Sequence, residues 1–170
     1  MSNDGKYYYV LDGKKAFFKL TGNLKYTSAS KFDTFLDKLF DCNPDFEEVL
    51  VDLSETAFLD STNLGFLASI AEFMSEKYDK KVAIYSPKED INKILESVGF
   101  NEVFDLVTDI DKQECDLTEV SSEAGAANRS CSKMMLDAHK ALINVCNKNA
   151  DKFCNVVDLL QKSVDEEKRG

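Results

Sequence analysis

Residues 49–66 read VLVDLSETAFLDSTNLGF, and they join a short apolar run to a segment with a helical repeat. The run from Val49 to Leu53 is typical of a buried strand. After a polar turn, apolar residues recur at helical spacing, at Leu64, Leu67, Ala68, Ala71 and Met74. We therefore predict a buried strand that turns directly into a helix.

Ser61 lies at the corner between this strand and this helix. Asp60 is a good N-cap candidate, which places Ser61 in the first helical turn, beside free backbone N–H groups and the positive end of the helix dipole. We expect an exposed Ser61 hydroxyl, and a phosphate added to it would be partly stabilised by its own helix. A plain helix-cap role for Ser61 is the alternative.

The surrounding segments alternate between strand and helix patterns. Before the corner, residues 7–11 and 14–21 are β-prone and flank Asp12-Gly13, which is a hairpin signal. A helix is expected from Thr27 or Ser28, and a strand over residues 81–85. Ser86, Pro87 and Glu89 then resemble an N-cap, a first helical residue and a capping box, for a helix that ends at Gly99. With a last strand at residues 103–107, the pattern predicts an α/β fold, a mostly parallel mixed sheet with an N-terminal antiparallel hairpin and helical cover.

Composition narrows the classes of function. A 170-residue chain with 44% hydrophobic residues is long enough for one core and an appendage. The formal net charge of −10 disfavours nucleic acid or an anionic membrane as partner. No apolar run has the length of a membrane span, and no signal-peptide pattern is present, so we expect a cytoplasmic protein. Its odd number of cysteines, without C-x-x-C spacing, indicates reduced thiols; a redox pair of Cys146 and Cys154 is the alternative.

The C-terminal part differs in character from the rest. We expect a domain over residues 1–108, a polar linker over 109–129, and an amphipathic helical extension over 130–170. The extension is predicted to be two helices, or one long helix with a weak middle. Helices of this length need a surface that buries their apolar stripes. Docking on the chain's own domain, formation of a homodimer and capture of a partner's groove are the three hypotheses.

Four sequence matches resemble the STAS domain of bacterial anti-sigma factor antagonists, over roughly residues 6–108. They are Asp52-Leu53-Ser54 followed by Phe58-Leu59-Asp60-Ser61-Thr62-Asn63-Leu64-Gly65; Leu20-x-Gly22-x-Leu24; Val82-Ala83-Ile84-Tyr85; and Leu95-x-x-Val98-Gly99-Phe100-x-x-Val103-Phe104.

The resemblance implies a STAS-like fold and a partner-switching function. It implies phosphorylation of Ser61, with Thr62 as second choice, by an anti-sigma factor that is a GHKL-type serine kinase, and reversal by a PP2C-type phosphatase. Asn63 stands where the family usually has Gly, and its larger side chain would keep a partner's backbone further away. The predicted partner-binding residues are Asp60, Ser61, Thr62, Asn63, Leu64 and Phe66. The alternative function is a non-catalytic STAS adaptor of a larger assembly, joined through the C-terminal helices.

Enzymatic chemistry finds little support in the sequence. Ser61 lacks the Gly-x-Ser-x-Gly setting of a hydrolase nucleophile. The single histidine, His139, lies in the C-terminal extension, where we expect it to be exposed or close to a helix cap; a histidine phosphotransfer helix is the alternative. The carboxylate clusters lack a calcium-loop pattern, and there is no glycine-rich phosphate loop. We expect no enzymatic activity, no cofactor and no metal site.

Overall fold

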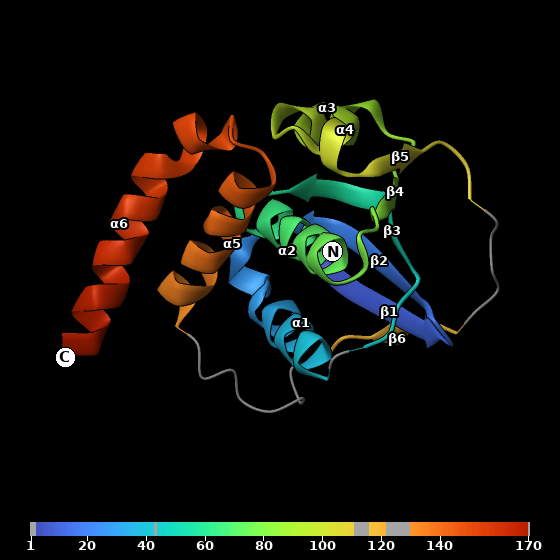
Figure 1. Cartoon of the computed structure of the whole chain (residues 1–170), viewed down its shortest axis with the longest axis horizontal. Helices are drawn as coiled ribbons and strands as arrows, with labels where there is room; N and C mark the ends of the chain where they lie inside the picture. The colour runs from blue at the N-terminus through green and yellow to red at the C-terminus, as the bar shows by residue number, and fades with distance from the viewer. Residues whose placement is uncertain (1–2, 43, 111–115, 122–129, 170) are drawn as a thin grey trace.

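The computed structural model describes residues 3–42, 44–110, 116–121 and 130–169. Its described strands form one mixed sheet with the order β5-β4-β3-β2-β1-β6 (Figure 1). The antiparallel pairs are β1 with β2 and β1 with β6, while β2, β3, β4 and β5 pair in parallel. The strands are β1 (Lys6–Asp12), β2 (Lys15–Leu24), β3 (Glu48–Leu59), β4 (Ala83–Tyr85), β5 (Asp105–Val107) and β6 (Thr118–Glu119). The predicted fold class is confirmed.

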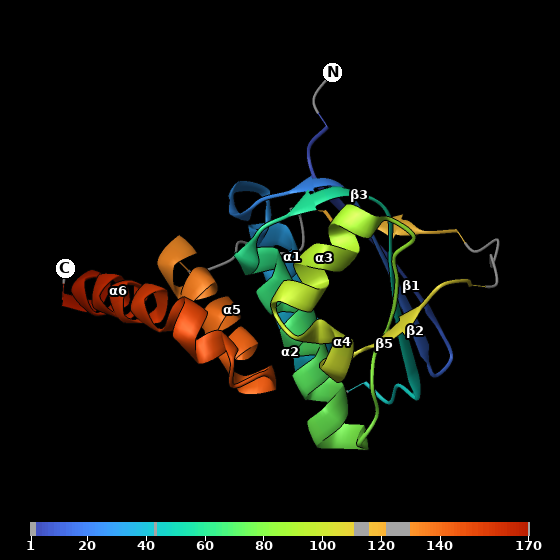
Figure 2. The same cartoon turned by 90° about the horizontal axis from the view of Figure 1, so that it is seen from above.

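The helices lie in layers on one side of the sheet. Seen from above, α1, α2, α3 and α4 lie next to the strands, and α5 and α6 form a further layer beyond α2 (Figure 2). The described helices are α1 (Ser30–Asp41), α2 (Ser61–Tyr78), α3 (Glu89–Ser97), α4 (Phe100–Val103), α5 (Cys131–Val145) and α6 (Asn149–Arg169), with a short 3₁₀ turn, η1, at Tyr26–Ser28. None of the described helices is long and apolar enough to cross a lipid bilayer.

The N-terminal hairpin forms as its sequence predicts. Gly13 has a φ of 59°, a left-handed conformation that glycine adopts without a steric penalty. In β2, buried residues alternate with more exposed ones, which is the pattern of a strand with one face on the core. On that face, the Phe32 ring of α1 stacks on the Tyr7 ring at 4.4 Å and meets the Phe18 ring edge-on at 6.2 Å.

Two predicted helix starts are wrong. Helix α1 begins at Ser30 after Ala29, without a side-chain cap, because residues 26–28 form η1 and Ser28 Oγ donates to the Lys25 carbonyl instead. Helix α3 begins at Glu89 after Lys88, so the Ser86 capping box does not form. Ser86 Oγ is buried without a hydrogen-bond partner among the described residues.

Strand β6 lies inside the segment that we expected to be a linker. Thr118 and Glu119 pair with Tyr9 and Tyr8 of β1, and the Val120 N–H donates to the Tyr7 carbonyl at 2.8 Å. The Val120 side chain is buried. These contacts satisfy part of the outer edge of β1, which would otherwise present unpaired backbone groups. Residues 111–115, with Cys115, and residues 122–129 lie outside the described residues.

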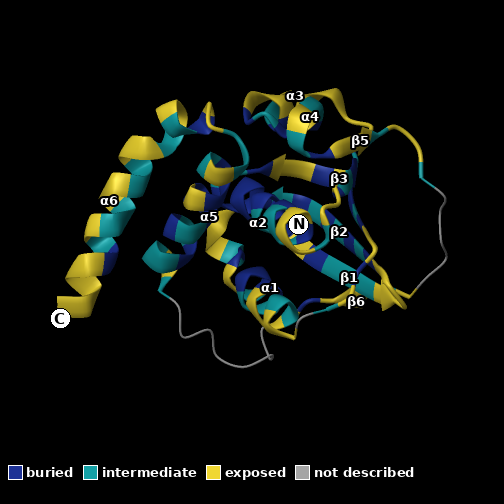
Figure 3. Cartoon of the chain, viewed as in Figure 1, coloured by how far each residue is buried: buried dark blue, intermediate teal, exposed yellow. Residues whose placement is uncertain are grey.

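The C-terminal extension consists of two helices that pack against each other, and α5 also packs along α2. Figure 3 shows α2 as largely buried and α6 as largely exposed. The two helices confirm the predicted extension. Of the three hypotheses for its role, docking on the chain's own domain is the one that the structure contains.

Candidate functional site

The corner between β3 and α2 is organised by Asp60. This residue has an extended backbone, with φ −86° and ψ 177°, and its Oδ1 accepts the Asn63 N–H at 3.0 Å, as an N-cap does. Its Oδ2 accepts the Tyr26 N–H at 2.7 Å, and its own N–H donates to the Leu24 carbonyl at 3.0 Å. Asp60 therefore joins the end of β2, η1 and the start of α2, and the predicted cap is confirmed.

Asn63 completes a buried polar network behind this corner. Its side chain is fully buried; Nδ2 donates to Asp60 Oδ1 at 2.9 Å, and Oδ1 accepts the Tyr7 hydroxyl. Burial, and secondarily the Asp60 charge, raise the pKa of Tyr7 above its usual range. A tyrosine hydroxyl is protonated at neutral pH in any case, so it is the donor to Asn63 Oδ1. The Asn63 side chain thus points into the fold, where it satisfies Tyr7 and orients the capping carboxylate.

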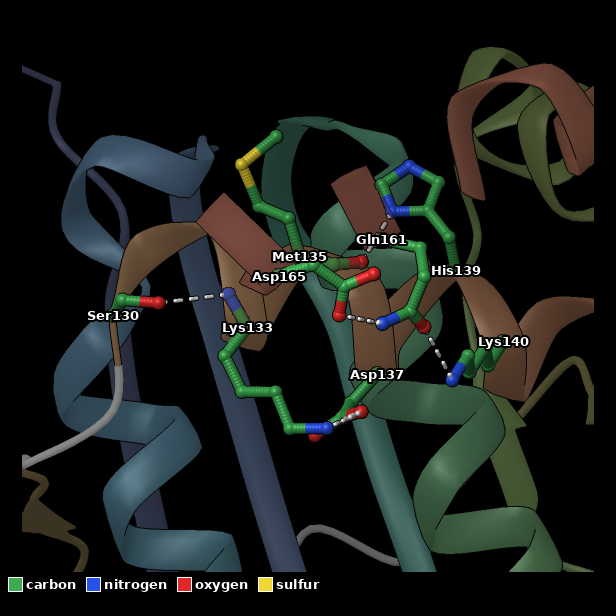
Figure 4. Close-up of polar contacts among 8 residues, drawn as sticks. All are labelled: Ser130, Lys133, Met135, Asp137, His139, Lys140, Gln161 and Asp165. Carbon is green, nitrogen blue, oxygen red and sulfur yellow. Dashed lines mark hydrogen bonds and ion pairs between the residues drawn. The ribbon is translucent and has the colours of Figure 1, made fainter. Parts of the chain in front are cut away.

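Ser61 is the first residue of α2 and is half-buried. Its Oγ lies 2.8 Å from His139 Nε2, on α5. His139 is only 3% exposed, and its Nδ1 lies 2.6 Å from the Met135 carbonyl oxygen (Figure 4). A carbonyl can only accept, so Nδ1 carries the proton; in the neutral imidazole Nε2 is then an acceptor for the Ser61 hydroxyl. The expectation of a freely exposed hydroxyl is wrong, and so is that of an exposed or cap-proximal His139.

The predicted partner-binding residues fall into two groups. Asp60 and Ser61 are partly exposed at the corner, whereas Thr62, Asn63, Leu64 and Phe66 are buried. The Phe66 ring faces inward and meets the Phe32 ring of α1 at 5.8 Å. The structure therefore places these residues on the cap and about the first two turns of α2, but it presents only the first two of them to solvent.

Helix α5 is the element that covers the outer face of α2. A Cβ atom added to Gly65 would lie 2.3 Å from the Ala138 carbonyl oxygen, so the two helices approach closely at this glycine. Helix α5 also contacts α6, where the His139 ring lies 5.5 Å from the Phe153 ring, measured between ring centroids. Ser61 and His139 are 78 residues apart in the sequence. The signal that could have indicated a covering element such as α5 is the composition of α2. Its residues 62–71 are nearly all buried, and a helix that is apolar all round is covered on more than one side.

Several charged groups along β2 and β3, which lead to the corner, have partners. Lys19 forms an ion pair with Glu55, and Lys88 Nζ donates to the Thr56 carbonyl at 2.9 Å. Asp52 is buried, and its Oδ1 accepts the Ser54 N–H at 2.8 Å. No group of metal-ligating side chains occurs among the described residues. What the corner offers chemically is a hydroxyl at a capped helix N-terminus.

A family model and several solved structures are similar to this chain. The family model of the STAS domain matches residues 9–113. The structure described as the anti-sigma factor antagonist SpoIIAA in its unphosphorylated form is similar, with a TM-score of 0.51 and 11% identity over 60% of this chain and 87% of the other. The NMR structure of the protein TM1081 has a TM-score of 0.50 and 18% identity, over 58% of this chain and 78% of the other. The phosphorylated form of SpoIIAA, the Bacillus cell fate determinant, has a TM-score of 0.48 and 12% identity, over 60% of this chain and 90% of the other. No match was found among curated proteins.

Proposed function

Because the chain belongs to the STAS domain family, we propose that it is a bacterial partner-switching protein, an anti-sigma factor antagonist controlled by reversible phosphorylation of Ser61. In this proposal the unmodified protein binds an anti-sigma factor that is also a GHKL-type serine kinase, and so releases a sigma factor in the cytoplasm. The kinase phosphorylates Ser61, and a PP2C-type phosphatase removes the phosphate. The protein itself catalyses neither step.

The observation that carries this proposal is the position of Ser61 as the first residue of α2, directly after the capping Asp60. A phosphate there would lie beside the N-terminal N–H groups of the helix, which favour negative charge. The modification therefore needs no refolding of the domain. Thr62, the second choice, is 2% exposed, so Ser61 is the better substrate of the two.

The effect on a partner follows from charge. Phosphorylation adds about 1.5–2 negative charges. A partner carboxylate about 5 Å away would be repelled by at most several kcal/mol at an effective dielectric near 20. Since about 1.4 kcal/mol changes affinity tenfold, a screened fraction of this repulsion would weaken binding about a hundredfold. A partner surface that accepts the hydroxyl would thus reject the phosphate.

A phosphorylation assay tests the site. The chain is incubated with its partner kinase and ATP, and the phosphate is located by peptide mass spectrometry. We expect one phosphate on Ser61, none on the Ser61→Ala variant, and normal modification of Ser75→Ala, which alters an exposed serine on the same helix. Modification of Ser61→Ala at the wild-type rate would contradict the proposal.

The second candidate function is an adaptor that joins a larger assembly through its C-terminal helices. One observation favours it: Leu159 of α6 is a large apolar side chain that is 64% exposed. The adaptor predicts that Leu159→Glu abolishes complex formation while Ser61→Asp preserves it. The partner-switching function predicts the reverse, so a binding assay with these two variants separates the candidates.

A further inference from the structure

Helix α5 occupies the surface that a partner of Ser61 would need. The Ser61 hydroxyl donates to His139 Nε2 at 2.8 Å, and four residues further along α2 Gly65 meets the Ala138 backbone. A phosphoryl group on Ser61 needs space beside Oγ, and on this side the buried imidazole fills it. The base of an attacking kinase would also have to take a proton that is already hydrogen-bonded to His139.

The contact is held in place by both C-terminal helices. The Met135 carbonyl fixes the ring through Nδ1, and the Phe153 ring of α6 supports its other side. Helix α6 is itself joined to α5, through Lys140 Nζ and Gln161 Oε1 at 3.4 Å (Figure 4). His139 is therefore held toward Ser61 by contacts from both α5 and α6.

A second attachment lies at the opposite end of α5. Asn149 Nδ2 donates to the Val98 carbonyl at 3.0 Å and to the Leu142 carbonyl at 2.8 Å, and Lys152 Nζ donates to the Ser97 carbonyl. This attachment involves the end of α3 and not the Ser61 corner. These hydrogen bonds would therefore hold the α5–α6 pair to the domain near residues 97–98 if α5 left Ser61.

We propose that the α5–α6 pair is an intramolecular competitor, which closes Ser61 and the adjoining face of α2 and is displaced when a partner binds. The displacing surface is a helix with a small residue where Ala138 now lies, because Gly65 leaves no space for a larger one. The identity of the displacing partner rests on the proposed function; the closure of Ser61 does not. The closed state lowers the apparent affinity of any partner by the fraction of molecules that are open.

Residue-specific alkylation measures the closure without a partner. In the full chain carrying Ser61→Cys, iodoacetamide modification of the introduced thiol is followed by peptide mass spectrometry. The peptides distinguish it from the native thiols, of which Cys42, Cys131 and Cys154 are exposed. Two substitutions, which we call wedges, add side-chain atoms between α2 and α5 and should separate the helices. They are Ala138→Leu on α5 and Gly65→Ala on α2. The matched control is Lys162→Ala, at an exposed position of α6. Hydrogen exchange of residues 61–71 and of β3 is measured in parallel, in chains that retain Ser61.

We expect the introduced thiol to react about tenfold or more slowly than Cys42, and each wedge to raise its rate about tenfold, with β3 still protected from exchange. Lys162→Ala should change neither the alkylation rate nor the hydrogen exchange. An introduced thiol that reacts as fast as Cys42, or unchanged exchange of residues 61–71 in both wedge variants, would overturn the proposal. If Ala138→Leu loses β3 protection, Gly65→Ala decides alone, because alanine favours α2 intrinsically. A confirmed closure in a chain whose kinase ignores Ser61 would refute the proposed function and keep this inference.

Discussion

Replacing Asn63 by leucine tests the polar network behind the corner. The substitution keeps the branched skeleton of the side chain and its number of heavy atoms, but it removes the donor to Asp60 Oδ1 and the acceptor of the Tyr7 hydroxyl. Tyr7 is 0% exposed, so its hydroxyl would be left without water or a partner. Losing a hydrogen bond to a charged group costs about 1.5–3 kcal/mol, and an unsatisfied buried hydroxyl adds about 1–3 kcal/mol.

The expected loss in the free energy of unfolding is about 3 kcal/mol, or a fall in Tm of about 6–12 °C for a chain of this size. Tyr7→Phe removes only the hydroxyl and should cost about 1 kcal/mol. In the double variant the unsatisfied hydroxyl is gone, so its loss should be smaller than the sum of the two single losses by about 1–2 kcal/mol. Urea unfolding of the four proteins gives this coupling energy. Losses that add within about 0.3 kcal/mol would refute the network.

Three further variants test the cap and the α2–α5 contact. Asp60→Ala removes the acceptor for the Asn63 and Tyr26 N–H groups and should lower the free energy of unfolding, measured in urea, by about 3 kcal/mol. Asp60→Asn keeps an acceptor and should lower it by only about 1 kcal/mol. Equal losses in the two variants would contradict the role of the carboxylate. Burial raises the pKa of Glu72 above its ordinary value of 4.5, although a hydrogen bond with Asn144 of α5 opposes this. A raised pKa contributes stability that is present below 4.5 and is lost as the pH rises through the folded-state pKa. Glu72→Gln should therefore stabilise the protein by about 0.5 kcal/mol at pH 7 and not at pH 4, and a gain that is equal at both pH values would refute this.

Local sequence signals predicted most of the domain because they act over a few residues. Asp12-Gly13 encodes its hairpin turn, Asp60 its helix cap, and Gly99, with a φ of 76°, the left-handed residue after α3. Where a competing local contact existed, the prediction was wrong: residues 26–28 form η1 instead of capping α1. N-cap residues in a sequence indicate positions at which a helix can begin. They do not indicate which of two possible helix starts the tertiary contacts select.

The sequence predicted the part of the candidate site that α2 provides, but not the part that α5 provides. Ser61 and Asp60 follow from the strand-to-helix transition, but nothing local in the sequence pairs Ser61 with His139. The prediction for α2 used a single stripe of apolar residues and so gave it one covered face. Phe66 and Ile70 lie outside that stripe and are buried too, which is the sign of cover on a second side. Asn63 was interpreted as a surface residue at the partner interface, whereas its amide satisfies a buried tyrosine.

The most direct test of the account is the affinity of the partner kinase for the full chain in two states, unmodified and stoichiometrically phosphorylated on Ser61. Isothermal titration at one ionic strength gives both dissociation constants, and Ser75→Asp serves as the control for added charge on the exposed end of α2. We predict that phosphorylation weakens binding about a hundredfold and that Ser75→Asp leaves it unchanged. Equal affinity of the phosphorylated and unmodified chains would contradict the claim that Ser61 is the switch.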